Sequence, residues 1–328
     1  MEAILRNSRV LVTGGAGFIG SNLVEALLNQ NNDVICLDNF ITGKRVNLEP
    51  FLTNKKFKLV EGDIRNAIDC RKAVDGVEYV LHQAALGSVP RSVKDPVTSN
   101  EVNVSGFLNM LVAARDAKVK RFVYASSSSV YGDHQGLPKV EAETGNPLSP
   151  YAITKKVNEL YAGVFAELYG LEVVGLRYFN VFGKRQDPNG EYAAVIPRFV
   201  KALIQHQRPE IFGNGEQSRD FTFIENVIHA NQAAALAPDK LALKTAYNIA
   251  FGERITLNEL FGMLRENLAI FDKEIAGIEP VYVSERPGDI PHSLASIDKA
   301  RKLLGYDPQY SVKEGLKEAI AWYWENLK

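Results

Sequence analysis

The stretch RVLVTGGAGFIG (9–20) decides the fold, because it leads from a short apolar run through closely spaced glycines into a helical pattern. Gly14, Gly17 and Gly20 stand three residues apart. So tight a turn lets backbone N–H groups and the N-terminus of a helix approach a pyrophosphate. The spacing is a weak signal by itself, because a strand-to-helix turn favours glycine with or without a ligand. The surrounding sequence must decide between the two interpretations.

Around this stretch the chain alternates between strand-like and helix-like patterns. Short apolar runs rich in β-branched residues predict buried strands at 9–13, 33–37, 57–60, 77–82, 120–126 and 171–179. Helical patterns lie between them at 18–30, 101–117 and 151–169. The alternation predicts the α/β class, with a doubly wound parallel sheet (Rossmann fold) and helices on both faces. Ligands of such sheets bind beyond the carboxyl ends of the strands.

After about residue 180 the alternation becomes irregular. Pro and Gly gather at 185–192, 212–220 and 284–289, and helices are expected near 195–206, 225–236, 256–268 and 312–327. We therefore expect a first domain at 1–180 and a smaller α/β C-terminal lobe at 181–328. Segments near 216–250 are expected to return to the first domain.

Composition and charge exclude several classes of function. The 328 residues are 46% hydrophobic and carry a formal net charge of -1, which predicts a soluble globular protein without a broad basic surface. We expect no nucleic-acid partner and no membrane partner. The opening residues lack the apolar region of a signal peptide, so a cytoplasmic location is expected. Cys36 and Cys70 form no CxxC motif and the histidines are not clustered, so we expect neither a metal site nor a disulfide.

Two acidic positions support a dinucleotide at the glycine turn. The second strand ends at Asp38, about twenty residues beyond the glycines, where a carboxylate can accept hydrogen bonds from the adenosine ribose. Asn39 follows instead of an arginine, which favours NAD over NADP. After the third strand, Asp63 and Ile64 lie where an adenine could be held. Asp63 could equally cap the next helix.

The stretch SPYAITK (149–155) predicts a helix start that carries chemistry. Ser149 can cap the helix and Pro150 suits its first position. Tyr151 and Lys155, four residues apart, then share one face. A tyrosine with a lysine one turn later is also an ordinary amphipathic surface, so the pair alone decides nothing.

Further motifs extend over nearly the whole chain: HQAALGSVPRS (82–92), SSSSVYG (126–132), RYFNVFG (177–183), SRDF (218–221) and RPGD (286–289). Together with the glycine turn and YAITK, they make the chain resemble the extended short-chain dehydrogenase/reductase (NAD-dependent epimerase/dehydratase) family. The likeness is greatest to its UDP-N-acetylglucosamine 4-epimerases of bacterial surface-polysaccharide pathways. The resemblance implies a tightly bound NAD, a UDP-sugar substrate and a homodimer that pairs the helices at 101–117 and 151–169. The implied cofactor contacts are Gly14, Gly17, Phe18, Ile19, Gly20, Asp38, Asn39, Gly43, Asp63, Ile64, Gln83, Ala84, Ala85, Tyr151, Lys155 and Tyr178.

The resemblance also implies a catalytic set of Ser127, Tyr151 and Lys155, in which Ser127 is placed by counting back from VYG. Tyr151 would take the proton of the C4 hydroxyl while the C4 hydride moves to NAD. The resulting 4-keto sugar would turn about its diphosphate link and take the hydride back on its other face. Free tyrosine titrates near 10, so a phenolate at neutral pH needs the positive charges of Lys155 and of the cofactor.

Neighbouring reactions remain as alternatives. The 4,6-dehydratases that this chain resembles carry an Asp-Glu pair where Ser128 and Ser129 stand here, and two serines are poor general acids and bases. Dehydration is therefore disfavoured. A UDP-glucose or UDP-glucuronate 4-epimerase needs the same catalytic set and stays open. A non-catalytic NAD-binding sensor or scaffold has no need of that set.

The substrate contacts are implied on both sides of the cleft. Arg219 and Arg286 would bind the diphosphate, although Arg219 beside Asp220 could be a surface pair and Asp289 could simply form a turn. A small residue at Ser293 would leave room for an N-acetyl group at C2 of the sugar. The complete set is Gly87, Ser88, Ser127, Ser128, Ser129, Asn180, Ala194, Val195, Arg219, Arg286, Asp289 and Ser293. His82, at a strand end, is expected to be structural.

Overall fold

The computed structural model describes residues 4–189, 193–285 and 291–327. Its centre is a seven-stranded sheet in which every neighbouring pair of strands is parallel. From edge to edge the strands are β3 (Phe57–Glu61), β2 (Asp33–Asp38), β1 (Arg9–Thr13), β4 (Tyr79–His82), β5 (Arg121–Ser127), β6 (Val173–Tyr178) and β11 (Thr245–Ile249). The strand order reverses between β1 and β4, which is where ligands bind in such sheets.

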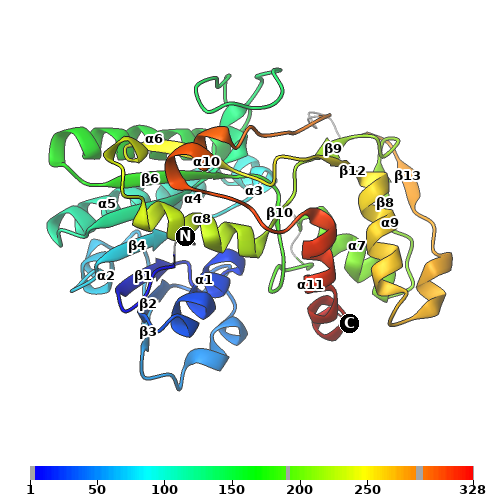
Figure 1. Cartoon of the computed structure of the whole chain (residues 1–328), viewed down its shortest axis with the longest axis horizontal. Coiled ribbons are helices and arrows are strands. Elements are labelled where there is room, and N and C mark those ends of the chain that lie inside the picture. The colour runs from blue at the N-terminus through cyan, green and yellow to red at the C-terminus, as the bar shows by residue number, and fades with distance from the viewer. Residues whose placement is uncertain (1–3, 190–192, 286–290, 328) are drawn as a thin grey trace.

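Helices cover both faces of this sheet (Figure 1). On one face lie α1 (Phe18–Asn29) and α8 (Ile224–Leu236), and on the other lie α2 (Ala67–Ala73), α5 (Phe107–Asp116) and α6 (Pro150–Tyr169). The buried strands supply both cores: Val10 and Val12 pack with the first group of helices, and Leu11 packs with the second. Successive side chains of a strand point to opposite faces of the sheet, and helices cover both faces. The strand sequences are therefore apolar throughout. The expected doubly wound sheet is confirmed.

The helix that carries Tyr151 begins for local reasons. The Ser149 hydroxyl accepts a hydrogen bond from the Ala152 N–H at 3.1 Å, and Pro150 is the first helical residue. The helix ends at Gly170, whose φ of 68° is left-handed. These signals place the first turn of α6 beside the carboxyl end of β5.

The helix expected at 101–117 starts earlier than its pattern predicted. Asp95 caps α4 (Pro96–Asn100), which continues through a π-helical segment (Glu101–Gly106) into α5. A short helix, α3 (Val89–Lys94), precedes α4 and is capped by the side chain of Ser88. The prolines at the starts of α3 and α4 fit first-turn positions, which explains how a broken sequence pattern still builds consecutive helices.

The smaller lobe, at the right of Figure 1, is assembled from separate stretches of chain. It contains the helices α7 (Val195–Ile204), α9 (Leu257–Leu268) and α11 (Val312–Asn326). Its short strands are β8 (Glu210–Phe212) with β13 (Val281–Val283), and β9 (Ser218–Arg219) with β12 (Ile255–Thr256). Between these stretches the chain returns to the large sheet through β10 (Thr222–Phe223), which pairs with β7 (Val181–Phe182), and then through α8 and β11. α10 (Asp298–Leu304) also packs against β11.

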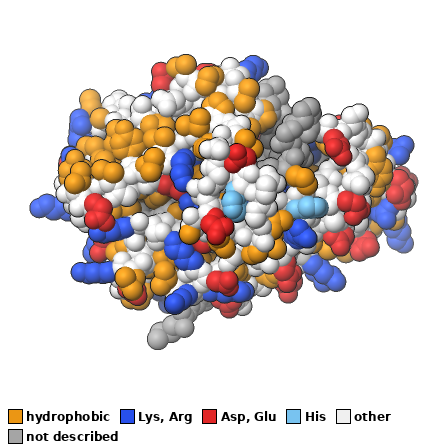
Figure 2. All heavy atoms as spheres, turned by 90° about the horizontal axis from the view of Figure 1, so that it is seen from above, with side chains coloured by type: hydrophobic (Ala, Val, Ile, Leu, Met, Phe, Trp, Pro, Cys, Tyr) orange, Lys and Arg blue, Asp and Glu red, His pale blue; other side chains and the backbone are white. Residues whose placement is uncertain are grey.

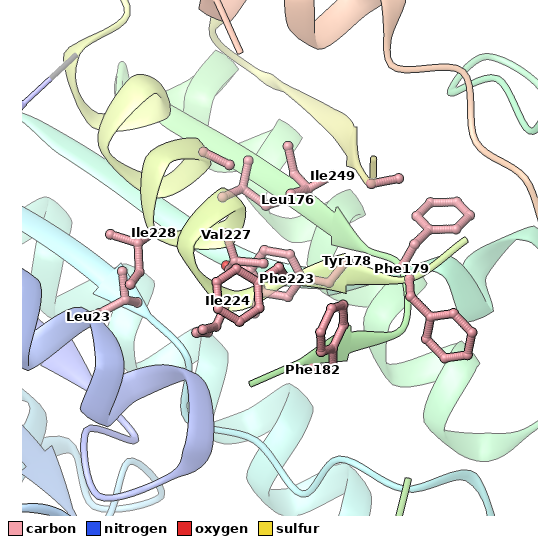
Figure 3. Packing of buried hydrophobic residues seen from close by; sticks show 14 of the residues in the cluster. Leu23, Leu176, Tyr178, Phe179, Phe182, Phe223, Ile224, Val227, Ile228 and Ile249 are labelled. Carbon is pink, nitrogen blue, oxygen red and sulfur yellow. The ribbon is translucent and has the colours of Figure 1, made fainter. Parts of the chain in front are cut away.

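One hydrophobic core joins the two parts. Figure 3 shows Leu23 of α1 near Ile228 of α8, and Phe179, Phe182 and Phe223 gathered where the sheet meets the lobe. The same cluster continues to Leu260 of α9 and Leu316 of α11. Because the packing is continuous, the loops that the lobe contributes are held at a defined place beside the sheet.

Three structural observations concern the disulfide, the metal site and the membrane span that the composition was used to assess. Cys36 and Cys70 are both buried and are not joined in a disulfide. Within the described ranges, no group of three or more His, Cys, Asp or Glu side chains is placed to hold a metal ion. No helix in those ranges is both long and apolar enough to cross a membrane.

Candidate active site

The glycine turn has a geometry that only glycine permits at two of its positions. Gly14 has a φ of 67°, and a Cβ there would lie 2.8 Å from the backbone of Ala84. A Cβ on Gly20 would lie 2.1 Å from the Gly14 carbonyl oxygen. Gly17 is the N-cap of α1, so free N–H groups at the start of that helix face the adjoining cavity. The turn thus forms a cradle for an anion at the switch point of the sheet.

A cavity of about 440 Å³ runs from this turn to Tyr151. Of the expected cofactor contacts, all except Asp63 line it. The lining also includes residues that the sequence did not single out: Leu37, Ile41, Thr42, Gly62, Leu86, Val102, Ala125, Ser126 and Val181. The cavity has an acidic group at one end, glycines in the middle and Tyr151 with Lys155 at the other, which fits the parts of NAD in order.

Asp38, at the end of β2, braces the loops around the adenosine end. Its carboxylate accepts N–H bonds from Ala16 at 2.9 Å and from Phe40 at 2.8 Å. Burial raises the pKa of Asp38, while these backbone donors oppose the rise. Arg45 is held by Glu61 through two hydrogen bonds, at 2.8 and 2.5 Å. The nearby guanidinium therefore has a carboxylate partner already, which agrees with NAD rather than NADP.

Asp63 has a different environment from the one expected. Its carboxylate pairs with Arg65 at 2.7 Å and accepts a hydrogen bond from the Asn39 amide at 2.9 Å. The hydrogen bonds from Arg65 lower the pKa of Asp63 to about 2. Asp63 does not line the cavity, whereas its neighbour Ile64 does. Its contact with adenine remains a prediction, and its visible role is to orient Asn39.

The structure brings Ser127, Tyr151 and Lys155 together. The Ser127 hydroxyl lies close enough to the Tyr151 hydroxyl to lower its pKa, and the Lys155 ammonium lies 5.9 Å from the centre of the Tyr151 ring. Lys155 is buried and donates to the Ala125 carbonyl at 2.8 Å. Burial raises the pKa of Tyr151 and lowers that of Lys155 to about 8. In the protein alone, Lys155 is thus fixed beside the tyrosine ring without a direct bond to its hydroxyl.

The neighbouring serines point elsewhere. Ser126 donates to the Glu159 carboxylate at 2.6 Å, and the Ser129 hydroxyl is buried without a hydrogen-bond partner in the described structure. Neither Ser128 nor Ser129 lines the cavity. The geometry therefore favours Ser127 among the serines that the motif left open.

Two residues near the cofactor cavity were missed from the sequence. Asn231, on α8, bonds both Gln83 at 3.1 Å and the Tyr178 hydroxyl at 2.9 Å, and Tyr178 donates to Gln83 at 3.1 Å. The available signal was an asparagine inside an alanine-rich helix. Asn103 similarly bonds Leu86 and Thr154 beneath the cavity. His82 bonds Thr13, and burial lowers its pKa to about 3, which agrees with a neutral structural residue.

The expected substrate contacts are only partly gathered in this cavity. Gly87 and Asn180 line it, and the Asn180 amide donates to the Asp220 carbonyl at 2.9 Å. Ser88 caps α3, while Ala194 and Val195 form the start of α7, outside the cavity lining. Arg286 and Asp289 lie outside the described residues.

Asp220 holds the segment that carries Ser293. It is fully buried, which excludes the surface pair with Arg219 that the sequence allowed. Its carboxylate accepts N–H bonds from Phe251, Gly252 and Ala295, while the Ser293 N–H donates to the Ser218 carbonyl at 3.0 Å. Burial raises the pKa of Asp220 to about 7. Arg219 and Ser293 are consequently carried on adjoining backbone segments.

A family model, the NAD dependent epimerase/dehydratase family, matches residues 10–250. This chain belongs to that family. A "Putative UDP-glucose 4-epimerase" of Methanocaldococcus jannaschii is 39% identical to it over 319 residues, which are 97% of this chain and 99% of the relative. Membership confirms the family predicted from the motifs and its NAD cofactor.

Solved structures of family members are also similar to this chain. A UDP-N-acetylglucosamine 4-epimerase from Methanobrevibacter ruminantium, in complex with UDP-N-acetylmuramic acid, has a TM-score of 0.90 and 39% identity, covering 97% of this chain and 99% of that one. A UDP-glucuronic acid 4-epimerase from Bacillus cereus, in complex with UDP-glucuronic acid and NAD, has a TM-score of 0.86 and 31% identity, with 97% and 99% covered. The expected class of enzyme, an NAD-dependent nucleotide-sugar 4-epimerase, is confirmed.

Proposed function

We propose that this family member interconverts UDP-N-acetylglucosamine and UDP-N-acetylgalactosamine. The observation that carries the proposal is the approach of the Ser127 and Tyr151 hydroxyls, beside Lys155, at the end of the cavity that begins at the glycine turn. The pair lies where the nicotinamide end of a bound dinucleotide would meet a sugar held by the smaller lobe. In this arrangement, residues 1–180 hold NAD and residues 181–328 mainly hold the UDP-sugar.

The side chains divide the chemistry among themselves. Bound NAD supplies an acceptor that takes the C4 hydride and returns it to the other face of C4. Tyr151 takes the proton of the 4-hydroxyl and later returns it, while Ser127 bonds that oxygen and keeps it in line. Lys155 provides the positive charge that favours a phenolate, and its bond to Ala125 holds it in place. No net oxidation results, so the enzyme needs no added NAD in stoichiometric amounts and no metal.

The cavity lining favours epimerisation over dehydration. Expulsion of a 6-hydroxyl needs an acid and a base next to the catalytic tyrosine. Ser128 and Ser129 occupy the positions of the dehydratase carboxylates, and neither lines the cavity. Asp38, at the opposite end, is the only carboxylate among the described lining residues. Among the described lining residues, dehydration therefore finds no carboxylate pair beside Tyr151.

Ser293 supports the acetylated sugar. Its small side chain stands on the segment that Ser218 and Asp220 fix beside Arg219. A serine leaves volume for an N-acetyl group at C2, where a tyrosine would fill it. Arg219, Arg286, Asn180 and Asp289 are proposed to hold the diphosphate and the ribose. A second candidate, a UDP-glucose or UDP-glucuronate 4-epimerase, is favoured by the names of several similar proteins.

A second copy of this chain is proposed to cover an apolar surface on α6. Figure 2, which views the molecule of Figure 1 from above, shows hydrophobic side chains gathered at the left, on the side where Figure 1 places α6. Ile153, Leu160, Val164 and Leu168 of α6 are each at least half exposed. Val93 of α3 and Val97 of α4 are exposed as well, whereas no large exposed apolar side chain belongs to α5. The paired surface therefore involves α6 with α3 and α4 more than the expected segment at 101–117. An isologous pairing buries such a stripe against itself, and a monomeric mass at micromolar concentration would contradict it.

The proposed substrate is tested by product analysis. The purified enzyme is incubated without added NAD with UDP-N-acetylglucosamine, UDP-glucose or UDP-glucuronate in parallel, and the nucleotide sugars are separated by chromatography. We expect the acetylated pair to be interconverted with the highest kcat/KM. A preference for one of the other two sugars would replace the proposed substrate with the second candidate.

A further inference from the structure

Helix α6 contacts the end of β5 at three successive turns. The Tyr151 hydroxyl lies beside the Ser127 hydroxyl, Lys155 donates to the Ala125 carbonyl, and Glu159 accepts a hydrogen bond from the Ser126 hydroxyl at 2.6 Å. The spacing of four residues places all three side chains on one face of the helix. Two of these contacts involve the proposed catalytic groups, and Glu159 has no assigned role.

Glu159 forms a two-bond ion pair with Arg177 of β6. The guanidinium donates to the two carboxylate oxygens at 2.9 and 2.8 Å. The side chains are only 11% and 6% exposed. Arg177 stands directly beside Ser126 in the register of β5 and β6. The pair therefore connects α6 with two adjacent strands at the level of the active site.

The network continues away from the substrate. Arg177 donates to the Tyr131 hydroxyl at 3.1 Å, and Tyr131 donates to Asn248 of β11 at 2.6 Å. Glu159 and Arg177 line a separate cavity of about 180 Å³ and are absent from the lining of the NAD cavity. Glu159 thus acts on the chemistry only through Ser126, Lys155 and Arg177.

Stability alone does not account for this arrangement. A buried ion pair loses hydration that its own attraction barely restores, and well-packed apolar residues of similar size often serve the fold equally well. The pair does provide directional bonds from one helix turn to a strand end. Reacting groups need positions fixed by such bonds, because a displacement of about 1 Å can lower the rate on the order of a hundredfold.

We propose that Glu159, held by Arg177, is a positioning residue that fixes α6 against the end of β5 and so keeps the Tyr151 hydroxyl beside the Ser127 hydroxyl. The inference rests on the proposed function, because it assumes that Tyr151 and Ser127 act on the substrate. Glu159 touches neither substrate nor cofactor, and its effect is transmitted by the Ser126 bond and by its charge.

The charge of Glu159 has its own consequence. Burial lowers the pKa of Lys155, and the Glu159 carboxylate opposes that shift. Besides Glu159, the titratable groups that face Lys155 are His82 on β4 and Tyr151 on α6, while Tyr124 on β5 and Arg177 on β6 face Glu159. Removing the carboxylate takes a negative charge away from Lys155 and leaves the positive Arg177 unpaired. Both changes favour the neutral form of the lysine. Lys155 would then lose its proton at a lower pH.

The test compares Glu159→Gln with Glu167→Gln in the NAD-loaded enzyme. Glu167 lies two turns further along α6 and pairs with Lys244 in an exposed salt bridge, so it serves as the matched control. Glu159→Gln is expected to lower kcat by about 10- to 100-fold with KM within about threefold. The alkaline limb of its pH profile is expected at lower pH. Glu167→Gln is expected to match the parent in all three quantities.

A second variant separates positioning from folding. Glu159→Gln combined with Arg177→Gln removes both charges, so no buried charge is left unpaired, and the same loss of kcat is expected per NAD-loaded chain. The proposal is wrong if either folded variant matches the parent in kcat and pH profile. It is also wrong if all lost activity is explained by a smaller folded, NAD-loaded fraction. Failure of the parent enzyme to act on any UDP-sugar would instead contradict the proposed function.

Discussion

The two ends of the candidate active site, the cofactor end and the proposed substrate end, are built in different ways. At the cofactor end, the glycine turn and Gln83 directly follow the neighbouring strands β1 and β4, and Asp38 is the last residue of β2. At the proposed substrate end, Asn180, Arg219 and Ser293 come from stretches far apart in the chain that meet because the smaller lobe returns repeatedly to the sheet. Regular local structure therefore forms the cofactor end, whereas long-range packing brings together the residues that we propose to select the sugar. The predictions below probe the junction of the two ends and then each end separately.

The largest effect is expected at Tyr151, where the two ends meet. Tyr151→Phe removes the proposed base and keeps the ring, so kcat should fall by about a hundredfold or more. Bound NAD and thermal stability should remain close to those of the parent, because the ring still fills its site. Steady-state kinetics together with the NAD content of denatured protein checks this. Near-parent turnover would remove Tyr151 from the mechanism.

The cofactor end is tested by Gly14→Ala with Gly170→Ala as its control. Both glycines have a left-handed φ, of 67° and 68°, but only at Gly14 would the new Cβ meet a backbone, at 2.8 Å. The strain common to both is about 1–3 kcal/mol of unfolding free energy. Only Gly14→Ala should also lose most of its bound NAD. Equal NAD content in the two variants would show that the tight turn is not part of the cofactor site.

The substrate end is tested by Ser293→Tyr. The larger side chain should lower kcat/KM for UDP-N-acetylglucosamine by about tenfold or more, because overpacking costs about 1–3 kcal/mol where the ligand fills the space. UDP-glucose, which lacks the acetyl group, is the internal control and should lose much less. An equal loss for both sugars would show that Ser293 does not face the C2 substituent.

The smallest effect expected is on the pH dependence of the parent enzyme. Burial lowers the pKa of Lys155 to about 8, so the ammonium is present below that pH and is lost as the pH rises through it. Because the charged form supports the phenolate, kcat/KM should decline on the alkaline side of about pH 8. A pH–rate profile at constant ionic strength measures this. A flat profile up to pH 10 would mean that the lysine charge is not required.

The strands and turns at the cofactor end could be read from the sequence because their signals are local. The runs expected at 33–37 and 57–60 became β2 and β3 within a residue, and the Ser-Pro start of α6 lies where its capping residues placed it. The seventh strand, β11, was not predicted as a strand. Its sequence, TAYNI, lies in a stretch of irregular pattern, and it joins the sheet only because α8 first crosses back over one face.

The residues of the candidate site were harder to predict, because many of their contacts are not local in the sequence. Asn231 and Asp220 act through contacts with residues far away in sequence, and no local spacing reveals them. Asp63 was expected at the adenine, but its interaction with Arg65 depends on side-chain directions that the sequence does not disclose. The sequence could not choose among the four serines at 126–129, because only their surroundings differ: Ser126 bonds Glu159, whereas Ser127 lies beside Tyr151.

The central claim, that a hydride leaves C4 and returns to the same sugar, is tested most directly with an isotope. UDP-N-acetylglucosamine carrying deuterium at C4 is incubated with the purified enzyme in ordinary water without added NAD, and the product is examined by mass spectrometry. The account predicts UDP-N-acetylgalactosamine that retains its deuterium at C4, with no accumulation of NADH. Product that has exchanged the label for solvent hydrogen, or NADH that accumulates in proportion to product, would contradict it.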